Sequence, residues 1–196
     1  MNVDPVLIEL PAWLDTARLR LRPPQAGDGA MVCAAVKESL PELRRFLASL
    51  PWVASDPTPE SSEAWCRNAM ANVIARKDMP FLLLDKSSLG TPALVGVVGL
   101  HRPVWATPKF EIGFWARSSQ AGRGYISEGV MALAALAFEQ LHAARVELII
   151  DEDNAASRRV AQRCGFTLEG TLRNERRAPD GTLRHSCVYA RTQALT

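Results

Sequence analysis

The chain has 196 residues, with 23 basic and 21 acidic side chains and a formal net charge of +2. This length is typical of one domain with a substantial core, and the balanced charge excludes a nucleic-acid-binding tail and a polybasic membrane patch. The cysteines (Cys33, Cys66, Cys164 and Cys187) form no C-x-x-C pair and the histidines lack metal-binding spacing, so we predict neither a metal site nor a disulfide framework.

The chain is expected to begin with a lead-in and a strand. Residues 1–15 contain two prolines and mixed polarity, and we interpret them as a loose lead-in to a domain that spans 1–196. In residues 16–22 leucine and arginine alternate with a period of two. This pattern predicts a half-buried strand whose arginines face solvent.

Two short helices are expected next. Asp28 is a candidate N-cap for a helix over residues 29–38. A second short helix is predicted to follow Pro41 and to be broken by Pro51. Its Leu50 is expected to face inward.

A third helix and three strands follow. Pro59 at a first helical position predicts a helix that runs to about Lys77 and buries Ile74. The three apolar segments after it are expected strands, with turn residues from Ser87 to Pro92 between the first two. These segments are residues 81–84, 94–100 and 109–115. Short connections between consecutive strands indicate an antiparallel meander.

The last part of the chain alternates helices and strands. The expected elements are a helix ending near residue 143, a strand at 145–151, a helix at 154–164 ended by Gly165, and two strands at 166–177 and 184–191. Asp180-Gly181 is a hairpin signal between the last two strands. The predicted fold class is therefore α/β, with a mixed, mostly antiparallel central sheet flanked by helices.

A glycine turn lies between the strand at 109–115 and the following helix. Gly122 and Gly124 allow positive φ and leave backbone N–H groups uncovered, and the first helical turn adds further free N–H groups. Such a turn is suited to hold a phosphate. A strand–helix turn without a ligand is the alternative, because a bare G-x-G is a weak signal. The carboxyl end of the strand is where a β-α-β unit places its ligand.

Four stretches carry a resemblance to a known family. They are residues 16–23, 110–115, 122–125 with the helix after them, and 154–161 running on to 165–170. In this order they resemble the GCN5-related N-acetyltransferase (GNAT) superfamily, and within it the branch of ribosomal-protein alanine N-acetyltransferases. The resemblance spans nearly the whole chain. It implies the fold of that superfamily and acetyl-coenzyme A as co-substrate, with no metal.

The resemblance also implies which residues hold acetyl-coenzyme A. The strand before the turn splays from its neighbour and pairs with the pantetheine arm, and one of its N–H groups polarises the thioester carbonyl. The amides of the turn hold the pyrophosphate, Asn154 bonds the arm, and two arginines either reach phosphates or are surface residues. The full set is Phe114, Trp115, Ala116, Arg117, Gln120, Ala121, Gly122, Arg123, Gly124, Tyr125, Ile126, Asn154 and Arg163.

Three residues are candidates for the chemistry. Ser157 matches the serine of the alanine-acetyltransferase branch, and Ala161 stands where many members carry a tyrosine acid, so Ser157 is implied to donate a hydrogen bond to the leaving sulfur. Its alternative is an ordinary serine in a first helical turn. Glu111 is the first candidate base, acting through a water that it holds, and Glu175 is the second; exposed strand residues are the alternative for both. His185 stands where relatives often show aspartate, which leaves the acceptor open.

The expected reaction is direct attack of a primary amine on acetyl-coenzyme A without an acyl-enzyme. A protein N-terminal α-amine, as on a ribosomal protein, is the favoured acceptor, with a small-molecule amine as the alternative. A non-catalytic module that senses coenzyme A is a further alternative. A dinucleotide-dependent oxidoreductase is disfavoured, because Ser127 replaces the third glycine. We expect a cytoplasmic monomer or homodimer without direct contact to membrane or nucleic acid.

Overall fold

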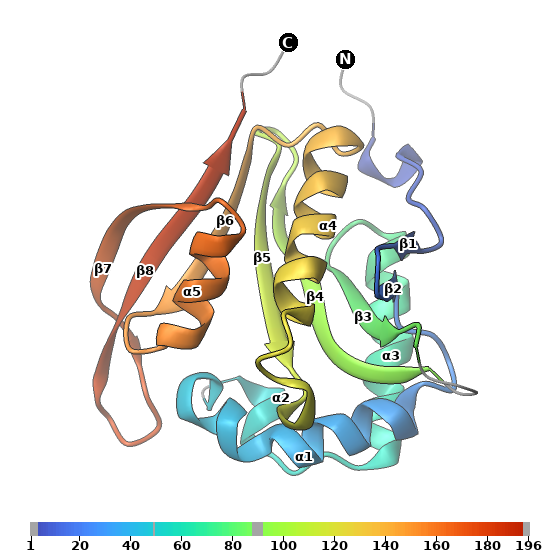
Figure 1. The fold of residues 1–196 in the computed structure, drawn as a ribbon, viewed down its shortest axis with the longest axis horizontal. Coiled ribbons are helices and arrows are strands. Elements are labelled where there is room, and N and C mark those ends of the chain that lie inside the picture. Colours follow the sequence, from blue (N-terminus) through green and yellow to red (C-terminus); the bar gives the residue numbers. More distant parts are fainter. Residues whose placement is uncertain (1–3, 49, 88–91, 194–196) are drawn as a thin grey trace.

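The computed structural model describes residues 4–48, 50–87 and 92–193. Within these residues, the strands form one mixed sheet in the order β1-β2-β3-β4-β5-β6-β8-β7 (Figure 1). The strands are β1 (Leu14–Asp15), β2 (Leu19–Arg22), β3 (Met79–Asp85), β4 (Ala93–Val104), β5 (Lys109–Ala116), β6 (Arg145–Asp151), β7 (Thr167–Arg177) and β8 (Leu183–Thr192). The helices are α1 (Gly29–Leu47), α2 (Pro51–Ala54), α3 (Pro59–Ile74), α4 (Tyr125–Glu139) and α5 (Ala155–Arg163), with 3-10 turns η1 (Pro5–Leu7) and η2 (Ser118–Gln120).

The sheet has an antiparallel meander and an antiparallel hairpin joined by one parallel contact. β1 to β5 pair antiparallel in chain order, and β8 pairs antiparallel with β6 on one side and with β7 on the other. β5 and β6 are parallel and are connected through α4. The predicted α/β class, the meander and the β7–β8 hairpin are confirmed. At the hairpin, Gly181 has φ +89° and the Thr182 N–H donates to Asp180 Oδ1.

Each face of the sheet has its own core. α4 and α5 cover one face, where Leu133 packs with Phe110 and other buried strand residues. α1 and α3 cover the opposite face, where Val36 and Leu43 pack over Leu82. In Figure 1, α4 lies in front of the sheet and α3 behind it. None of the described helices is long and apolar enough to cross a lipid bilayer.

The predicted break at Pro41 is wrong, because α1 continues through it to Leu47. The buried stripe of α1 runs through Val32, Val36, Leu40 and Leu43, so its apolar face passes the proline without interruption. Burial along this face outweighs the lost N–H of proline, which costs about 3 kcal/mol in a helix interior. The packed partner, and not the local sequence, therefore sets the length of α1.

Smaller differences concern helix ends. Pro51 begins α2 as its first residue instead of only ending a helix. Asp28 stands at the N-cap position of α1, but its carboxylate bonds Arg22 at 2.6 and 2.7 Å and makes no cap hydrogen bond. Leu50 and Ile74 are exposed, against expectation. The predicted turn at 87–92 lies mostly outside the described residues.

Candidate functional site

The sheet splits between β5 and β6. Their parallel pairing covers Lys109↔Arg145, Phe110↔Val146 and Glu111↔Glu147, and in the described residues it goes no further. Beyond this point β5 stays paired to β4 as far as Ala116, and β6 stays paired to β8 as far as Asp151. The two facing edges therefore carry free N–H and C=O groups. These groups can accept an extended ligand as a strand would be accepted.

The glycine turn lies at the open end of this split. Gly122 has φ +78° and Gly124 has φ +80°, and Gly124 is the N-cap of α4. A Cβ at Gly122 would meet nothing within 4 Å, so glycine is required there by the backbone conformation and not by crowding. Among the described residues, the backbone N–H groups of 122–124 have no acceptor. With the first turn of α4 they form a row of free donors at the positive end of the helix dipole.

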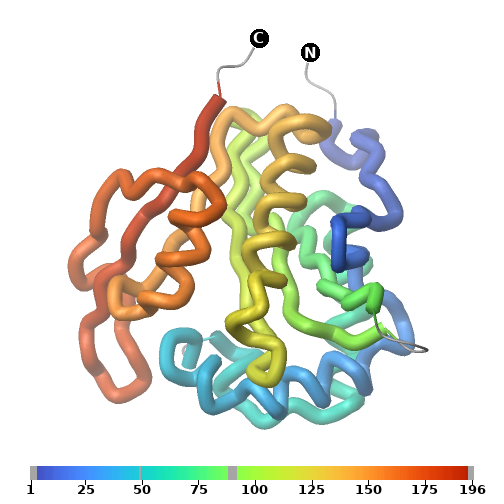
Figure 2. The backbone as a smooth tube through the Cα atoms, viewed as in Figure 1, coloured from blue at the N-terminus to red at the C-terminus, as the bar shows by residue number. Residues whose placement is uncertain are grey.

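Helix α1 anchors the entry to this turn. Glu38 accepts from the Ser119 N–H at 2.8 Å and from Arg117 Nε at 2.6 Å, and Ser39 Oγ accepts from the Ser118 N–H at 3.0 Å. Hydrogen bonds from Ser119, followed by that from Arg117, lower the pKa of Glu38 to about 2. Figure 2 shows α1 running beside the turn that precedes α4. The free donors are thus held on a fixed support.

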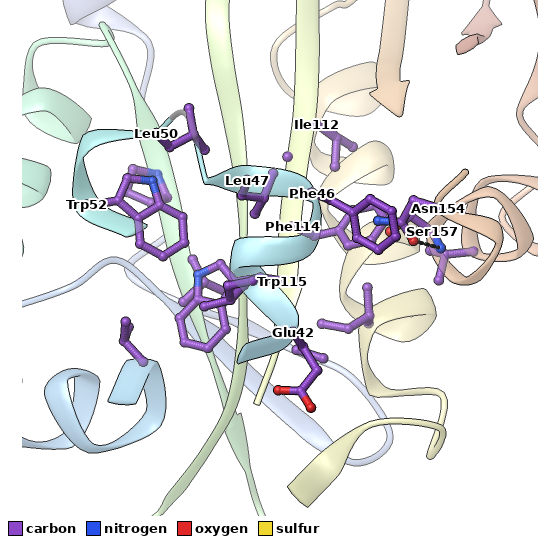
Figure 3. A pocket seen from close by; sticks show the side chains of 18 of the residues that line it. Glu42, Phe46, Leu47, Leu50, Trp52, Ile112, Phe114, Trp115, Asn154 and Ser157 are labelled. Carbon is purple, nitrogen blue, oxygen red and sulfur yellow. Dashed lines mark hydrogen bonds between the residues drawn. The ribbon is translucent and has the colours of Figure 1, made fainter. Parts of the chain in front are cut away.

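A cavity of about 1480 Å³ extends from the glycine turn to the helices on the other face of the sheet. Its far wall comes from α1, α2 and α3, with Phe46, Leu47 and Trp52 visible in Figure 3. The rings of Trp52 and Trp115 are 6.3 Å apart between centroids and tilted by 38°. The cavity therefore joins a row of free main-chain N–H groups to a wall of apolar side chains.

Most of the sequence-predicted site residues line this cavity together. These are Glu111, Phe114, Trp115, Ala116, Gln120, Ala121, Gly122, Gly124, Tyr125, Ile126, Asn154, Ser157 and Arg163. Three predicted residues do not line it. Arg117 is bound to Glu38, Arg123 is exposed while its carbonyl accepts from Arg18, and the Glu175 carboxylate accepts from Ser186 Oγ at 2.8 Å.

Asn154 and Ser157 lie on the α5 side of the split. Asn154 is the N-cap of α5, and its Oδ1 accepts from the Ser157 N–H at 3.1 Å, as drawn in Figure 3. In the described part of the chain, neither Asn154 Nδ2 nor Ser157 Oγ has a partner. Both atoms are free to donate to a ligand in the cavity.

Glu111 lies at the apex of the split, since Glu111↔Glu147 is the last pair between β5 and β6. The residue is 8% exposed, and burial raises the pKa of its carboxyl group. Arg102 donates to it at 3.0 Å from a backbone with φ +48°. All four cysteines are buried, and burial raises the pKa of Cys66 to about 12. Such thiols are poor nucleophiles.

Sequence reasoning missed an aspartate–histidine pair in the same cavity. His101 on β4 binds Asp78 through Nδ1, and both residues line the cavity. The ring lies over Gly99 and Gly113, which are cross-strand partners. Glycines within two neighbouring strands were the available signal, because strand glycine often marks a close approach by another group. Among the described residues, no cluster of three or more His, Cys, Asp or Glu could hold a metal ion.

The chain is similar to several known proteins. YdaF of Bacillus subtilis (strain 168) is 35% identical over 82 residues, which are 42% of this chain and 45% of that protein. The ribosomal-protein-serine acetyltransferase of Escherichia coli (strain K12) is 35% identical over 80 residues, 41% of this chain and 45% of that protein. These matches span less than half the length of either relative.

A solved structure extends the similarity to the whole fold. It is RimL, a ribosomal L7/L12 alpha-N-protein acetyltransferase, in complex with coenzyme A, with a TM-score of 0.80 and 21% identity, covering 90% of this chain and 95% of that one. At this identity the likeness concerns the fold. The family model for the acetyltransferase (GNAT) domain matches residues 18–167, well over half of the chain. The protein therefore belongs to the GNAT acetyltransferase domain family.

Proposed function

We propose that the protein transfers an acetyl group from acetyl-coenzyme A to a primary amine. The observation that carries this proposal is the open split between β5 and β6 with the free amides of residues 122–124 at its mouth. A pyrophosphate fits the donor row, and an extended pantetheine arm fits the unpaired strand edges. Membership of the family supports the same ligand.

The residues around the split have distinct roles in this proposal. The bound thioester supplies an activated acetyl carbonyl. A free N–H at the edge of β5, near Phe114 and Trp115, donates to that carbonyl oxygen as charge develops on it. Asn154 orients the pantetheine arm through Nδ2, and Ser157 Oγ donates to the departing sulfur. Arg163 lines the same cavity and is available for a phosphate.

The proposed acceptor is the N-terminal α-amine of a protein, with a ribosomal protein in the cytoplasm as the favoured case. The names of the similar proteins support it. Chemistry supports it as well: bringing an α-amine to its neutral form at pH 7 costs about 1 kcal/mol, whereas a lysine costs about 4.6 kcal/mol. Glu42, Asp56 and Glu111 line the cavity and favour a cationic acceptor.

A two-stage experiment tests the proposal. Calorimetric titration with acetyl-coenzyme A, coenzyme A, NAD and ATP is expected to show micromolar binding of the first two ligands alone. Peptides with free or blocked N-termini, with and without lysine, are then assayed for acetylation by mass spectrometry. Acetylation that requires a free N-terminus and ignores lysine supports the α-amine.

Two other results would redirect the proposal. Turnover of small amines but of no peptide would point to a small-molecule acceptor, which the paired indoles of Trp52 and Trp115 could hold. Tight binding of acetyl-coenzyme A without transfer to any amine would point to a sensor. Absence of binding would contradict the proposal as a whole.

A further inference from the structure

Three titratable side chains form a row across the sheet, on the face covered by α1 and α3. Asp78 precedes β3, His101 is on β4 and Glu111 is on β5. Met79 pairs with Leu100, which makes Asp78 and His101 neighbours, and His101 pairs directly with Glu111. All three side chains line the large cavity. The row therefore runs from the residue before β3, across β4, to β5, which forms one edge of the split.

The imidazole of His101 rests on a floor made by two glycines. A Cβ at Gly99 would stand 2.7 Å from Cε1 and Nε2, and a Cβ at Gly113 would stand 2.8 Å from Cδ2 and 2.9 Å from Nε2. Any other residue at either position would displace the ring. The next pair along these strands on the same face is Val97↔Trp115, so the ring leans from His101 toward the aromatic wall.

The contacts of the ring select its tautomer. Nδ1 binds the Asp78 carboxylate, which can only accept, so the neutral ring carries its proton on Nδ1. Nε2 is then an acceptor, and among the residues that the structure describes it has no partner. An imidazole with one nitrogen held by a carboxylate and the other free in a cavity has the arrangement of a general base.

We propose that His101, oriented by Asp78, is the base that accepts a proton from the acceptor ammonium. The proposal rests on the acetyl transfer proposed above. Nε2 takes one proton from R–NH3+ and later releases it to water. The amine nitrogen forms the C–N bond to the acetyl carbon, the C–S bond breaks, and the thiolate takes the second proton from the nitrogen. The products are the acetylated amine and coenzyme A.

Glu111 is less suited to this role than His101. One of its carboxylate oxygens already accepts from Arg102 at 3.0 Å, and the residue is buried. His101 is held by Asp78 through Nδ1, and among the described residues its Nε2 has no partner, whereas the Glu111 carboxylate already binds a cation. The imidazole nitrogen is therefore better placed to accept a proton from the substrate.

The test is rescue of a His101→Ala variant by imidazole. The substitution opens space above Gly99 and Gly113 that added imidazole can fill. We expect kcat/KM for the acceptor to fall about 100-fold or more, which is typical of a lost general base, with the Kd for acetyl-coenzyme A within twofold of wild type. Added imidazole is expected to raise the kcat/KM of His101→Ala at least tenfold. His142→Asn is the matched control, since His142 is exposed and outside the cavity, with φ +52° that asparagine tolerates.

The remaining variants separate positioning from chemistry. Asp78→Asn is expected to lower kcat about tenfold while the acceptor KM stays within twofold, because it disturbs the tautomer and not the binding wall. Glu111→Gln is expected to lose less than His101→Ala and to show no rescue. Retention of more than a third of the wild-type kcat/KM in His101→Ala, or a loss that imidazole does not reduce while acetyl-coenzyme A still binds, overturns the proposal. If the wild type acetylates no amine, the proposed function fails instead, and the two failures are distinct.

Discussion

The two ends of the cavity are built from different parts of the chain. At the glycine turn the polar groups are backbone N–H groups from one continuous segment, 122–126. The far wall is built instead from side chains, among them the aromatic rings of Phe46, Trp52 and Trp65, which come from three separate helices. A site made of main chain tolerates changes of side chain but not of φ. A site made of side chains can change its ligand by single substitutions.

The two ends also differ in how they are supported. The turn is fixed by the Glu38 and Ser39 contacts from a 19-residue helix. The far wall depends on α2, a helix of four residues in which Val53 is buried and Trp52 is 38% exposed. We therefore expect acetyl-coenzyme A binding to depend on conformation at the turn, and acceptor binding to depend on contact area at the wall. Four substitutions test this difference.

Gly124→Val is expected to give the largest effect. A β-branched residue at φ +80° is a conformational outlier that costs about 1–3 kcal/mol, so the Kd for acetyl-coenzyme A should rise about 10- to 100-fold. The Cβ itself has room, since its nearest neighbour is Arg18 at 3.4 Å. Calorimetry measures the Kd, and circular dichroism checks that the variant is folded. An unchanged Kd would contradict a cradle made of backbone.

Glu38→Ala removes the anchor of the turn. It is expected to raise the Kd for acetyl-coenzyme A about fivefold, equivalent to about 1 kcal/mol for partly exposed charged hydrogen bonds. Its matched control is Glu42→Ala, which loses one acceptor for Ser118 Oγ and should change the Kd less than twofold.

Glu38 also predicts a dependence of stability on pH. Its folded pKa is about 2 against an ordinary 4.5, so the carboxylate stabilises the fold above pH 4.5 and this contribution disappears as the pH falls toward 2. The difference in unfolding free energy between wild type and Glu38→Ala should therefore shrink over this interval. A constant difference across the interval would show that the anchor is not electrostatic.

Trp52→Ala addresses the far wall. An aromatic pair contributes about 0.5–1.5 kcal/mol, so loss of the contact with Trp115 should raise the acceptor KM about threefold. The Kd for acetyl-coenzyme A should stay unchanged. Steady-state kinetics at saturating acetyl-coenzyme A measure the first value and calorimetry the second. A parallel loss in both would mean that the two ends are not independent.

Arg123→Ala is expected to have the smallest effect. The side chain is exposed and outside the cavity, while the N–H of the residue remains in the donor row. The Kd for acetyl-coenzyme A should stay within twofold in moderate salt. A loss of affinity for acetyl-coenzyme A as large as that of Gly124→Val would show that the Arg123 side chain, and not the backbone, binds the ligand.

The sequence predicted well what depends on local pattern. Alternation identified β2, apolar runs identified β3 to β6, and Gly122 and Gly124 indicated the turn with positive φ. These features are readable because neighbouring residues alone create the period or permit the conformation. The prediction of a helix starting at Asn154 succeeded for the same reason, since Asn154 is the N-cap of α5.

Features that depend on partners distant in sequence could not be predicted in this way. The continuation of α1 past Pro41 follows from burial against the sheet. Glu38 meets Ser119 across about 80 positions of chain, and His101 meets Asp78 only because β3 and β4 pair. Glu175 and Arg117 do not line the cavity, and each binds another polar group, Ser186 and Glu38 respectively. Their roles in a ligand complex stay predictions.

The early end of the β5–β6 pairing has a consequence for solubility as well. Open strand edges attract other extended chains, and proteins usually shorten, charge or cover them to avoid aggregation. Here a pair of such edges lies inside the sheet, beyond Glu111 and Glu147, with strands on both outer sides. A strand from another molecule would need to enter a narrowing gap, whereas a slender linear ligand need not displace anything. The fold thereby keeps unpaired backbone N–H and C=O groups available to a ligand while they lie inside the sheet and not at its outer edge.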